Sequence, residues 1–324
     1  MKYRDLGKTG MLVSEIGFGA WGIGGRTAGD TSYGETDDTR SLAALQRALD
    51  CGVTFFDTSS AYGSGHSEVL IGKALGGVRH KAVIATKAGY EDWTRPPDFS
   101  AAAISLSTER SLRRLQTDYL DVLQLHNPPS EVLASDDTRE AISQLLAEGK
   151  IRAWGVSAKN PAGALEALRV ADAPIVQANF NMMDVRALTS GLLDEVAARG
   201  AAFIARTPLC FGFLSGTIGR RTVFAAGDHR GAWPRAQLDN WIDGARDLLS
   251  AVSASPGREG ALSALQFCLS FAAVSSAIPG ILQPVEAETN AGASDMGALP
   301  AAVVEAVLAI NRQRDFFVAP ERGP

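Results

Sequence analysis

The stretch that decides the fold is Val53-Thr54-Phe55-Phe56-Asp57-Thr58-Ser59-Ser60-Ala61-Tyr62-Gly63. It begins as an apolar, β-favouring run, stops on the carboxylate of Asp57, and turns through small polar residues to the phenol of Tyr62. A strand buried on both faces of a parallel sheet has such a continuous apolar sequence, and closed parallel sheets carry their sites at the carboxyl ends of the strands. We therefore expect Asp57 and Tyr62 at a functional site. The simpler alternative is that Asp57 caps a turn and Tyr62 packs in a loop.

Strand-like and helix-like segments alternate along the rest of the chain. Eight runs have strand character, at residues 16–18, 54–57, 81–87, 119–126, 151–157, 175–179, 202–206 and 277–280. Apolar spacing, capping residues and terminal glycines predict helices over residues 39–51, 67–75 (capped by Ser67), 100–115, 138–148 and 187–199, and one that starts at Pro161. This alternation predicts parallel βαβ units. Eight of them predict an α/β fold, a single (β/α)8 TIM barrel domain over residues 1–324.

Three additions to the barrel are expected. Residues 7–10 form the turn of a small N-terminal β-hairpin, and residues 300–314 form an extra C-terminal helix followed by a tail, 315–324, over one rim. The interval 209–259 is too long for a plain connection, so it is expected to be a long lid loop after strand seven.

One motif in the chain is interpreted as accidental. Residues 17–22 match G-x-G-x-x-G, but in a dinucleotide-binding fold that motif opens a helix directly. Residues 23–38 are instead rich in Gly, Thr, Ser and Asp, which favour turns.

Composition excludes several classes of partner. The 324 residues carry 31 Lys and Arg against 36 Asp and Glu, a net charge of −5, which offers no basic surface to nucleic acid or anionic lipid. No apolar run approaches the roughly 20 residues of a membrane span, and a cytoplasmic protein is expected.

The three cysteines are Cys51, Cys210 and Cys268, and their spacing suggests neither a disulfide framework nor a metal site. They are interpreted as small core residues, with a place for Cys210 beside a pocket as the alternative.

Four ionisable groups follow neighbouring predicted strands. Asp57 and Tyr62 follow the second strand, Lys87 ends the third and His126 ends the fourth. Consecutive strands of a barrel are adjacent, so these groups converge. A tyrosine hydroxyl in water has a pKa near 10, and a neighbouring ammonium favours the phenolate. A tyrosine, a lysine paired with an aspartate, and a histidine that positions a carbonyl are together suited to proton exchange with a carbonyl oxygen during hydride transfer.

The chain resembles the aldo-keto reductase family over nearly its whole length. The motifs that carry this resemblance are residues 17–21 (Gly-Phe-Gly-Ala-Trp), 56–63 (Phe-Asp-Thr-Ser-Ser-Ala-Tyr-Gly), 85–87 (Ala-Thr-Lys), 118–126 (Asp-Tyr-Leu-Asp-Val-Leu-Gln-Leu-His), 149–157 (Gly-Lys-Ile-Arg-Ala-Trp-Gly-Val-Ser) and 278–280 (Ile-Pro-Gly). The resemblance implies an NAD(P)(H)-dependent oxidoreductase with Asp57, Tyr62, Lys87 and His126 as its catalytic tetrad.

The resemblance also implies where the dinucleotide lies across the barrel mouth. Ser157 and Gln177 would hold the carboxamide, and Arg206 occupies the position of the aromatic residue that often stacks on nicotinamide. The further contacts that it implies are Gly19 and Trp21; Thr207, Pro208, Leu209, Gly212, Leu214 and Ser215 around the pyrophosphate; and Gly280, Gln283, Glu286 and Asn290 along the adenosine half. Trp21, Trp93 and Asn127, in loops on the same rim, are expected to line the substrate pocket.

Two departures from the family pattern matter. Ala158 stands where the family often has asparagine, which removes one carboxamide contact. Leu282 and Gln283 stand where NADPH-preferring relatives commonly place Arg or Lys, and neither can pair with a phosphate. The choice between NADP(H) and NAD(H) therefore stays open, with Arg220 or Arg221 of the lid as possible substitutes.

Rival functions fit less well. A glycosidase needs two carboxylates at strand ends, and a metal-dependent hydrolase needs several histidines on the rim, where only His126 qualifies. The remaining alternative is a cofactor-binding regulatory or redox-sensing subunit with little turnover, similar to the potassium-channel beta subunits. We expect a reductase of a small aldehyde or ketone, or a dehydrogenase of an alcohol such as a sugar or cyclitol, in a monomer or homo-oligomer.

Overall fold

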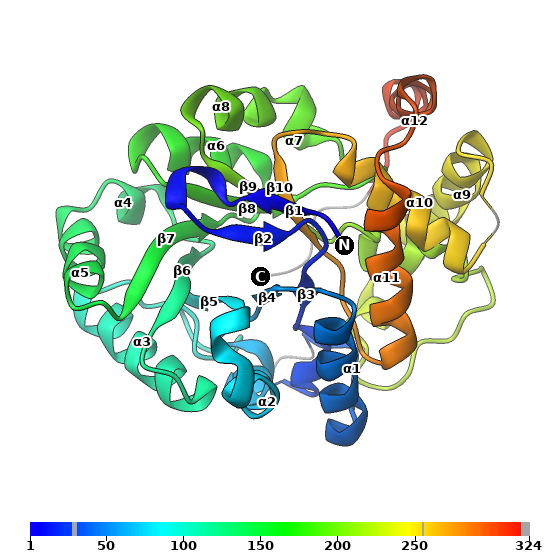
Figure 1. Ribbon diagram of the computed structural model, residues 1–324. Coiled ribbons are helices and arrows are strands. Elements are labelled where there is room, and N and C mark those ends of the chain that lie inside the picture. Colours follow the sequence, from blue (N-terminus) through cyan, green and yellow to red (C-terminus); the bar gives the residue numbers. More distant parts are fainter. Residues whose placement is uncertain (28–30, 255, 319–324) are drawn as a thin grey trace.

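Eight parallel strands form the barrel that the alternation predicts (Figure 1). The computed structural model describes residues 1–27, 31–254 and 256–318. Each strand is hydrogen-bonded to the next in chain order: β3 (Phe18–Gly19), β4 (Phe55–Asp57), β5 (Val83–Ala88), β6 (Leu120–His126), β7 (Ile151–Ser157), β8 (Ile175–Asn179), β9 (Ala202–Arg206) and β10 (Val274–Ile278). Parallel bridges from Ile16 to Ala277 and from Gly19 to Gly280 join the first strand to the last. The predicted (β/α)8 barrel is confirmed.

Helices surround the strands, and several of them begin at a capping side chain. They are α1 (Asp38–Asp50), α2 (His66–Leu75), α3 (Ala101–Leu115), α4 (Ser130–Leu133), α5 (Asp136–Ala147), α6 (Pro161–Val170), α7 (Arg186–Thr189), α8 (Leu192–Arg199), α9 (Arg235–Ala251), α10 (Arg258–Leu269), α11 (Pro284–Met296) and α12 (Ala301–Gln313). Asp37, Ser100 and Asn160 accept hydrogen bonds from the first turns of α1, α3 and α6. The expected Ser67 cap is wrong, because Ser67 lies inside α2 and donates to the carbonyl of Ala20 at 2.8 Å.

The predicted N-terminal hairpin closes the lower end of the barrel. Its strands are β1 (Tyr3–Asp5) and β2 (Leu12–Ser14). Leu6, Met11 and Val13 of the hairpin are buried in one cluster with inward-facing barrel residues such as Phe55 and Ile204. The hairpin thus leaves the opposite, carboxyl-terminal end of the strands as the face where a ligand can bind.

The inner face of the barrel changes from apolar to polar along the strands. Successive strand residues point to opposite faces, so alternate residues line the interior. The lower inward positions are apolar, among them Val83, Ala85 and Val122. The upper positions of the same strands are Lys87 and His126, and they continue around the barrel as Ser157, Gln177 and Arg206. The apolar layer fixes the strands, and the polar layer above it forms the floor of the site.

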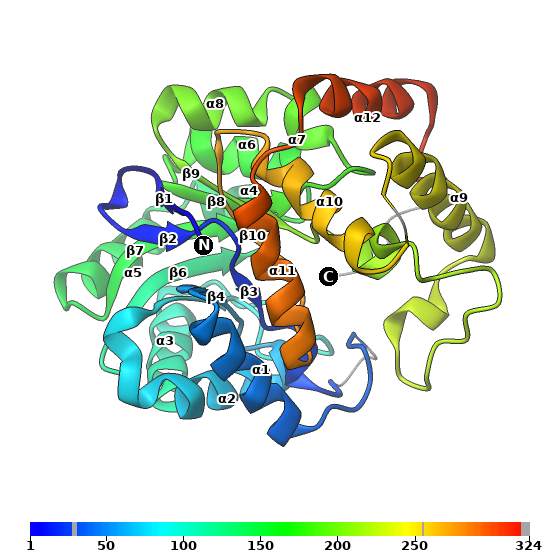
Figure 2. The same cartoon turned by 45° about the vertical axis from the view of Figure 1, so that its right-hand side comes forward.

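The segment after β9 is more ordered than a loop. It contains the 17-residue helix α9, which buries Leu238, Trp241 and Leu248. Helices α9 and α12 lie beside each other on one side of the barrel (Figure 2). The start of the C-terminal tail packs here too, since Phe316 is buried against Gly244 of α9. Among the described residues, no single helix is long and apolar enough to cross a membrane; only the bent pair α11 and α12, at 117° to each other, meets the length and composition test jointly.

Candidate active site

The end of β4, the turn after it and the end of β5 bring three ionisable groups together. The ammonium of Lys87 donates to Asp57 Oδ1 at 2.5 Å, to the carbonyl of Thr58 at 2.7 Å and to the hydroxyl of Tyr62 at 3.2 Å. The Lys87 side chain is fully buried. Burial lowers the pKa of Lys87, but the charge of Asp57 and the contact with Tyr62 outweigh burial and raise that pKa overall. Lys87 is therefore an ammonium at neutral pH, held in contact with a phenol.

His126 ends β6 in an aromatic enclosure and stays neutral. Burial lowers its pKa well below the ordinary value, and the positive charges of Lys87 and Arg206 lower it further. The rings of Tyr62, Tyr90 and Trp93 lie 6.1, 5.6 and 5.2 Å from the imidazole centroid. Nδ1 lies 3.3 Å from Ser59 Oγ, which itself accepts the amide of Ala61 at 3.2 Å. This leaves the Ser59 hydroxyl hydrogen for Nδ1 and favours the tautomer with its proton on Nε2.

A network of amide side chains lies beneath these groups. Asp57 Oδ2 accepts from Gln124 Nε2 at 3.0 Å and from Gln177 Nε2 at 2.8 Å. Gln177 also donates to Gln124 Oε1 at 3.2 Å and accepts from Ser157 Oγ at 3.0 Å. Sequence reasoning missed Gln124. Its signal was a polar residue two before His126, on the same inward face of the strand as His126 and the apolar Val122.

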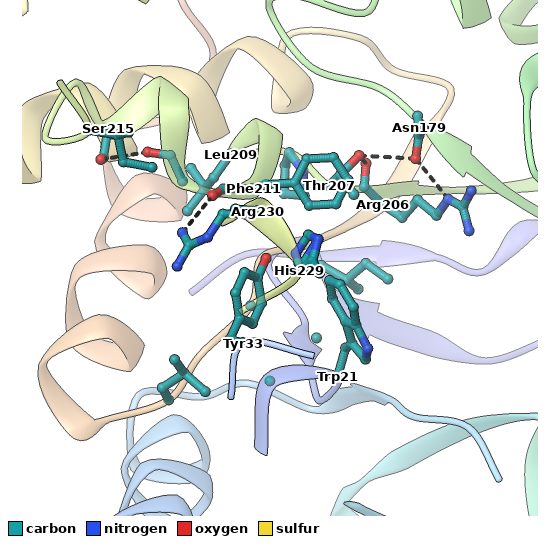
Figure 3. Close-up of a pocket in the computed structure, with 18 of the residues that line it drawn as sticks. Trp21, Tyr33, Asn179, Arg206, Thr207, Leu209, Phe211, Ser215, His229 and Arg230 are labelled. Atoms are coloured by element: carbon teal, nitrogen blue, oxygen red, sulfur yellow. Dashed lines mark hydrogen bonds between the residues drawn. The ribbon is translucent and has the colours of Figure 1, made fainter. Parts of the chain in front are cut away.

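A cavity of about 810 Å³ opens above this floor and runs along the barrel mouth. Asp57, Tyr62 and His126 line it, whereas Lys87 lies beneath them. Of the other residues named from sequence, those that line the cavity are Gly19, Trp21, Trp93, Gln177, Arg206, Thr207, Pro208, Leu209, Gly212, Ser215, Gly280, Glu286 and Asn290 (Figure 3).

Four of the named residues do not line the cavity. Ser157 and Leu214 are fully buried behind it, and Gln283 precedes the first turn of α11. The expected place of Asn127 in the substrate pocket is not seen: its backbone is left-handed (φ 50°), which turns the chain away from the strand direction, and its amide is buried without a partner among the described residues.

Two distant segments meet over the cavity, and sequence reasoning did not pair them. Ser32 and Tyr33 form bridges with Asp228, and the amide of His229 donates to the carbonyl of Ser32 at 2.9 Å. The Arg230 guanidinium carbon lies 4.7 Å from the Tyr33 ring centroid. We call residues 31–34 together with 228–230 the roof of the cavity. Its residues Tyr33, His229 and Arg230 line the cavity and lie near one another in Figure 3.

The roof encloses aromatic side chains. The Trp21 ring lies 5.0 Å from Tyr33, 4.8 Å from His229 and 6.5 Å from Phe211. Burial lowers the pKa of His229 to about 4, with the charge of Asp228 opposing and that of Arg230 adding to the effect. His229 is therefore neutral at physiological pH and forms part of an uncharged aromatic wall.

The donor set and shape of the cavity fit a nicotinamide dinucleotide. Its volume lies within the range of about 300 to 1,000 Å³ that ligand sites occupy. Lining groups are buried without hydrogen-bond partners among the described residues: Thr31 Oγ1, Trp93 Nε1, His229 Nε2 and Trp241 Nε1. Along one wall, Thr207, Cys210 and Phe211 have φ of 50°, 45° and 55°, and strained backbone of this kind is concentrated at ligand sites.

Comparisons with known proteins agree with the fold. The sequence matches the Aldo/keto reductase family over residues 15–312. It is 34% identical to aldo-keto reductase YhdN of Bacillus subtilis over 258 residues, 78% of this chain and 74% of that protein. It is 29% identical to a probable voltage-gated potassium channel subunit beta of Arabidopsis thaliana over 313 residues, 91% and 92% of the two chains. A solved glycerol dehydrogenase from Gluconobacter oxydans matches with a TM-score of 0.79 at 26% identity, over 99% of both chains.

The protein is thus an α/β-barrel enzyme of the oxidoreductase class. The chain belongs to the aldo/keto reductase family, as the sequence motifs predicted.

Proposed function

We propose that this protein transfers a hydride between NAD(P)H and a small aldehyde or ketone, or in reverse from an alcohol, with Tyr62 as the general acid and base. The observation that carries the proposal is the contact of 3.2 Å between the Tyr62 hydroxyl and the Lys87 ammonium. Bound nicotinamide would supply the hydride. The residues expected to hold the dinucleotide are those of the cavity wall, chiefly Gln177, Arg206 and Ser215.

The proton step follows from the fixed charge of Lys87. Because Lys87 remains an ammonium, it stabilises negative charge on the phenol oxygen of Tyr62. Tyr62 lines the cavity, so it can give its proton to a carbonyl oxygen there, and it can recover a proton from an alcohol in the reverse direction. Asp57 balances the lysine charge, so that the pair is tolerated in the buried floor.

His126 is suited to orient the substrate rather than to carry the proton. A neutral imidazole with its proton on Nε2 can donate a hydrogen bond to the same carbonyl oxygen without adding charge. Its aromatic neighbours hold the ring in place. The carbonyl would therefore be held by Tyr62 and His126 together.

The walls support a substrate that is neutral and hydroxylated. Trp93 Nε1 is buried beside His126 without a partner in the described part of the chain, and an indole N–H in an otherwise apolar wall favours a hydroxyl oxygen. The match to a glycerol dehydrogenase supports the same class. We include sugars, cyclitols and small polyols with their carbonyl forms.

The decisive experiment compares Tyr62→Phe with Tyr90→Phe. Both remove a phenol near His126, but the hydroxyl of Tyr62 contacts Lys87. Tyr62→Phe should lower kcat by about 10²- to 10⁴-fold, the usual contribution of general acid catalysis, with cofactor Kd unchanged. The kcat of Tyr90→Phe should stay close to that of the parent protein. Near-parent turnover in Tyr62→Phe would reject the proposal.

The same assay tests the regulatory alternative, which the match to a channel beta subunit raises. Parent protein that binds either dinucleotide but oxidises none with a panel of aldehydes and ketones would favour a redox-sensing subunit. No contact in the described residues favours that reading, and the buried Lys87–Asp57 pair beneath Tyr62 favours turnover.

A further inference from the structure

We infer that the carboxylate of Glu286 makes this protein bind NADH in preference to NADPH, by facing the adenosine ribose of the dinucleotide. The inference rests on the proposed function for the use of a nicotinamide dinucleotide. It adds which of the two forms is selected and which side chain selects it.

One face of α11 lines the cavity. Val285, Glu286, Thr289 and Asn290 belong to it, and their spacing of one turn places them on the same side of the helix. Tyr62 and His126 line the same cavity, so one continuous space connects the catalytic floor with the first turn of α11. A dinucleotide whose nicotinamide meets Tyr62 would place its adenosine toward this helix.

The amides at the start of α11 are already occupied. Glu286 Oε2 accepts from the backbone N–H of Leu282 at 2.6 Å and of Gln283 at 3.2 Å, and Oε1 accepts from Gln283 Nε2 at 3.3 Å. These helix-terminal amides are the groups that would otherwise bind a phosphate. In this chain an internal carboxylate holds them, so a 2′-phosphate would meet a negative charge instead of free donors.

The basic residues near α11 point the same way, apart from Arg258 of α10, an exposed residue that lines the cavity. Residues 279–290 contain no Lys or Arg. The guanidinium of Arg230 is held by Asp228 at 2.6 Å. Arg220, a candidate substitute from the lid, pairs with Asp239 and Asp243 of α9 and does not line the cavity. Arg221 does not line it either.

The charge of Glu286 extends beyond its own helix. Burial raises the pKa of Tyr33 in the roof; Arg230 opposes this, the charges of Asp228 and Cys210 add to it, and Glu286 makes the smallest contribution in the same direction. Tyr33 and Glu286 line the same cavity, so the carboxylate adds negative charge to it. A phosphate monoester carries a charge of about −1.5 to −2 at pH 7, which this negative charge disfavours. A ribose 2′-hydroxyl can instead donate a hydrogen bond to the carboxylate, as an acidic residue does in other NAD sites.

The test measures Kd for NADH and NADPH from the quenching of tryptophan fluorescence, because four of the five tryptophans, Trp21, Trp93, Trp233 and Trp241, line the cavity. Adenosine 5′-monophosphate and adenosine 2′,5′-bisphosphate serve as probes of the adenosine end alone. Glu286→Gln keeps an oxygen for the helix amides but removes the charge, and Glu286→Lys reverses it. Glu288→Gln is the matched control, since Glu288 lies on the same helix but pairs outward with Arg47 at 2.7 Å.

The parent should bind NADH about tenfold or more tightly than NADPH, a difference of about 1.4 kcal/mol. Glu286→Gln should remove most of this preference for both the dinucleotides and the adenosine probes. Glu286→Lys should invert it, and Glu288→Gln should keep it. Circular dichroism and the melting temperature of each variant check that it is folded.

Equal or tighter binding of NADPH by the parent would overturn the inference, as would an unchanged ratio in folded Glu286→Gln. Arg258, an exposed cavity-lining residue at the start of α10, provides a second check. If Arg258→Ala weakened only the 2′-phosphorylated ligands, a phosphate site would exist and the inference would fail. If the parent bound neither dinucleotide, the proposed function would fail with it, whereas activity with NADPH alone would leave the proposed function standing.

Discussion

The side-chain amide of Gln177 lies 2.8 Å from Oδ2 of Asp57, the carboxylate oxygen that Lys87 does not contact. Each oxygen of this buried carboxylate thus has its own donors. Gln124 completes the arrangement by bonding to both residues. The carboxylate that pairs with Lys87 is therefore held in one orientation by Gln124 of β6 and Gln177 of β8.

Gln124→Leu should reduce turnover although Gln124 does not line the cavity. The substitution removes one donor from Asp57 and leaves the Gln177 amide less well satisfied, at a cost of about 1 to 3 kcal/mol in unfolding free energy. We expect a fall of about tenfold in kcat/KM with a shifted pH profile, because the orientation of Asp57 toward Lys87 is loosened. Steady-state kinetics across pH provides the measurement. Gln144→Leu, on the exposed face of α5, should alter neither quantity.

Two variants, Lys87→Met alone and Lys87→Met combined with Asp57→Asn, should separate the role of Lys87 in stability from its role in turnover. The single substitution leaves the Asp57 carboxylate buried without its ammonium, and breaking such a pair lowers the free energy of unfolding by about 3 to 5 kcal/mol. Turnover should fall by about 10³-fold with the loss of the charge beside Tyr62. The double variant should recover much of the unfolding free energy in urea but none of the turnover. Recovery of turnover would contradict the role of Lys87.

The free energy of unfolding should increase with pH from about 4 to about 6.5, the ordinary pKa of histidine. The cause is the burial of two neutral imidazoles, His229 in the roof and His126 in the floor. Burial holds the pKa of His229 at about 4, and that of His126 well below its ordinary value, so both stay neutral in the folded state. Below the ordinary value, the unfolded chain takes up protons that the folded chain does not, so unfolding is favoured as pH falls. Urea titrations at several pH values measure the slope. His229→Gln should reduce the slope and leave the part that comes from His126, whereas the same change at the exposed His80 should leave the slope unchanged.

Trp93→Phe should discriminate between substrates. The change keeps an aromatic ring beside His126 but removes an indole N–H that has no protein partner among the described residues. KM for a hydroxylated carbonyl substrate should rise by about tenfold, because one hydrogen bond to the substrate is lost. A simple aldehyde without hydroxyls should show no change. Trp154→Phe, on β7 outside the cavity, is the control. Equal effects on both substrates would contradict the assigned contact.

The barrel and the meeting of Asp57, Tyr62, Lys87 and His126 were predictable because their signals are local. Each strand is an apolar run, and each functional residue stands at its end or just after it. Helix α9 was also present in the pattern, in Leu238, Trp241, Ala245 and Leu248. The residues that precede this helix favour turns, and for that reason the sequence predicts a loop over the whole interval.

The amide network and the roof could not be predicted, since both depend on pairs that are distant in sequence. Gln124 meets Asp57 across 67 positions, and nothing near either residue records this contact. Tyr33 and Asp228 are joined in the same way by bridges between two segments of irregular structure. Only the closed barrel brings such segments together, after the strands have fixed their positions.

The bridge between Ile16 and Ala277 affects how the chain folds during synthesis, because it joins the first strand segment of the barrel to the last. A nascent chain that has not yet emerged beyond β10 exposes two unpaired strand edges, and such edges recruit other chains. Closure therefore waits until β10 has been synthesised. Deletions that remove β10 should shift the expressed protein into inclusion bodies, even though every residue of the catalytic floor would still be present.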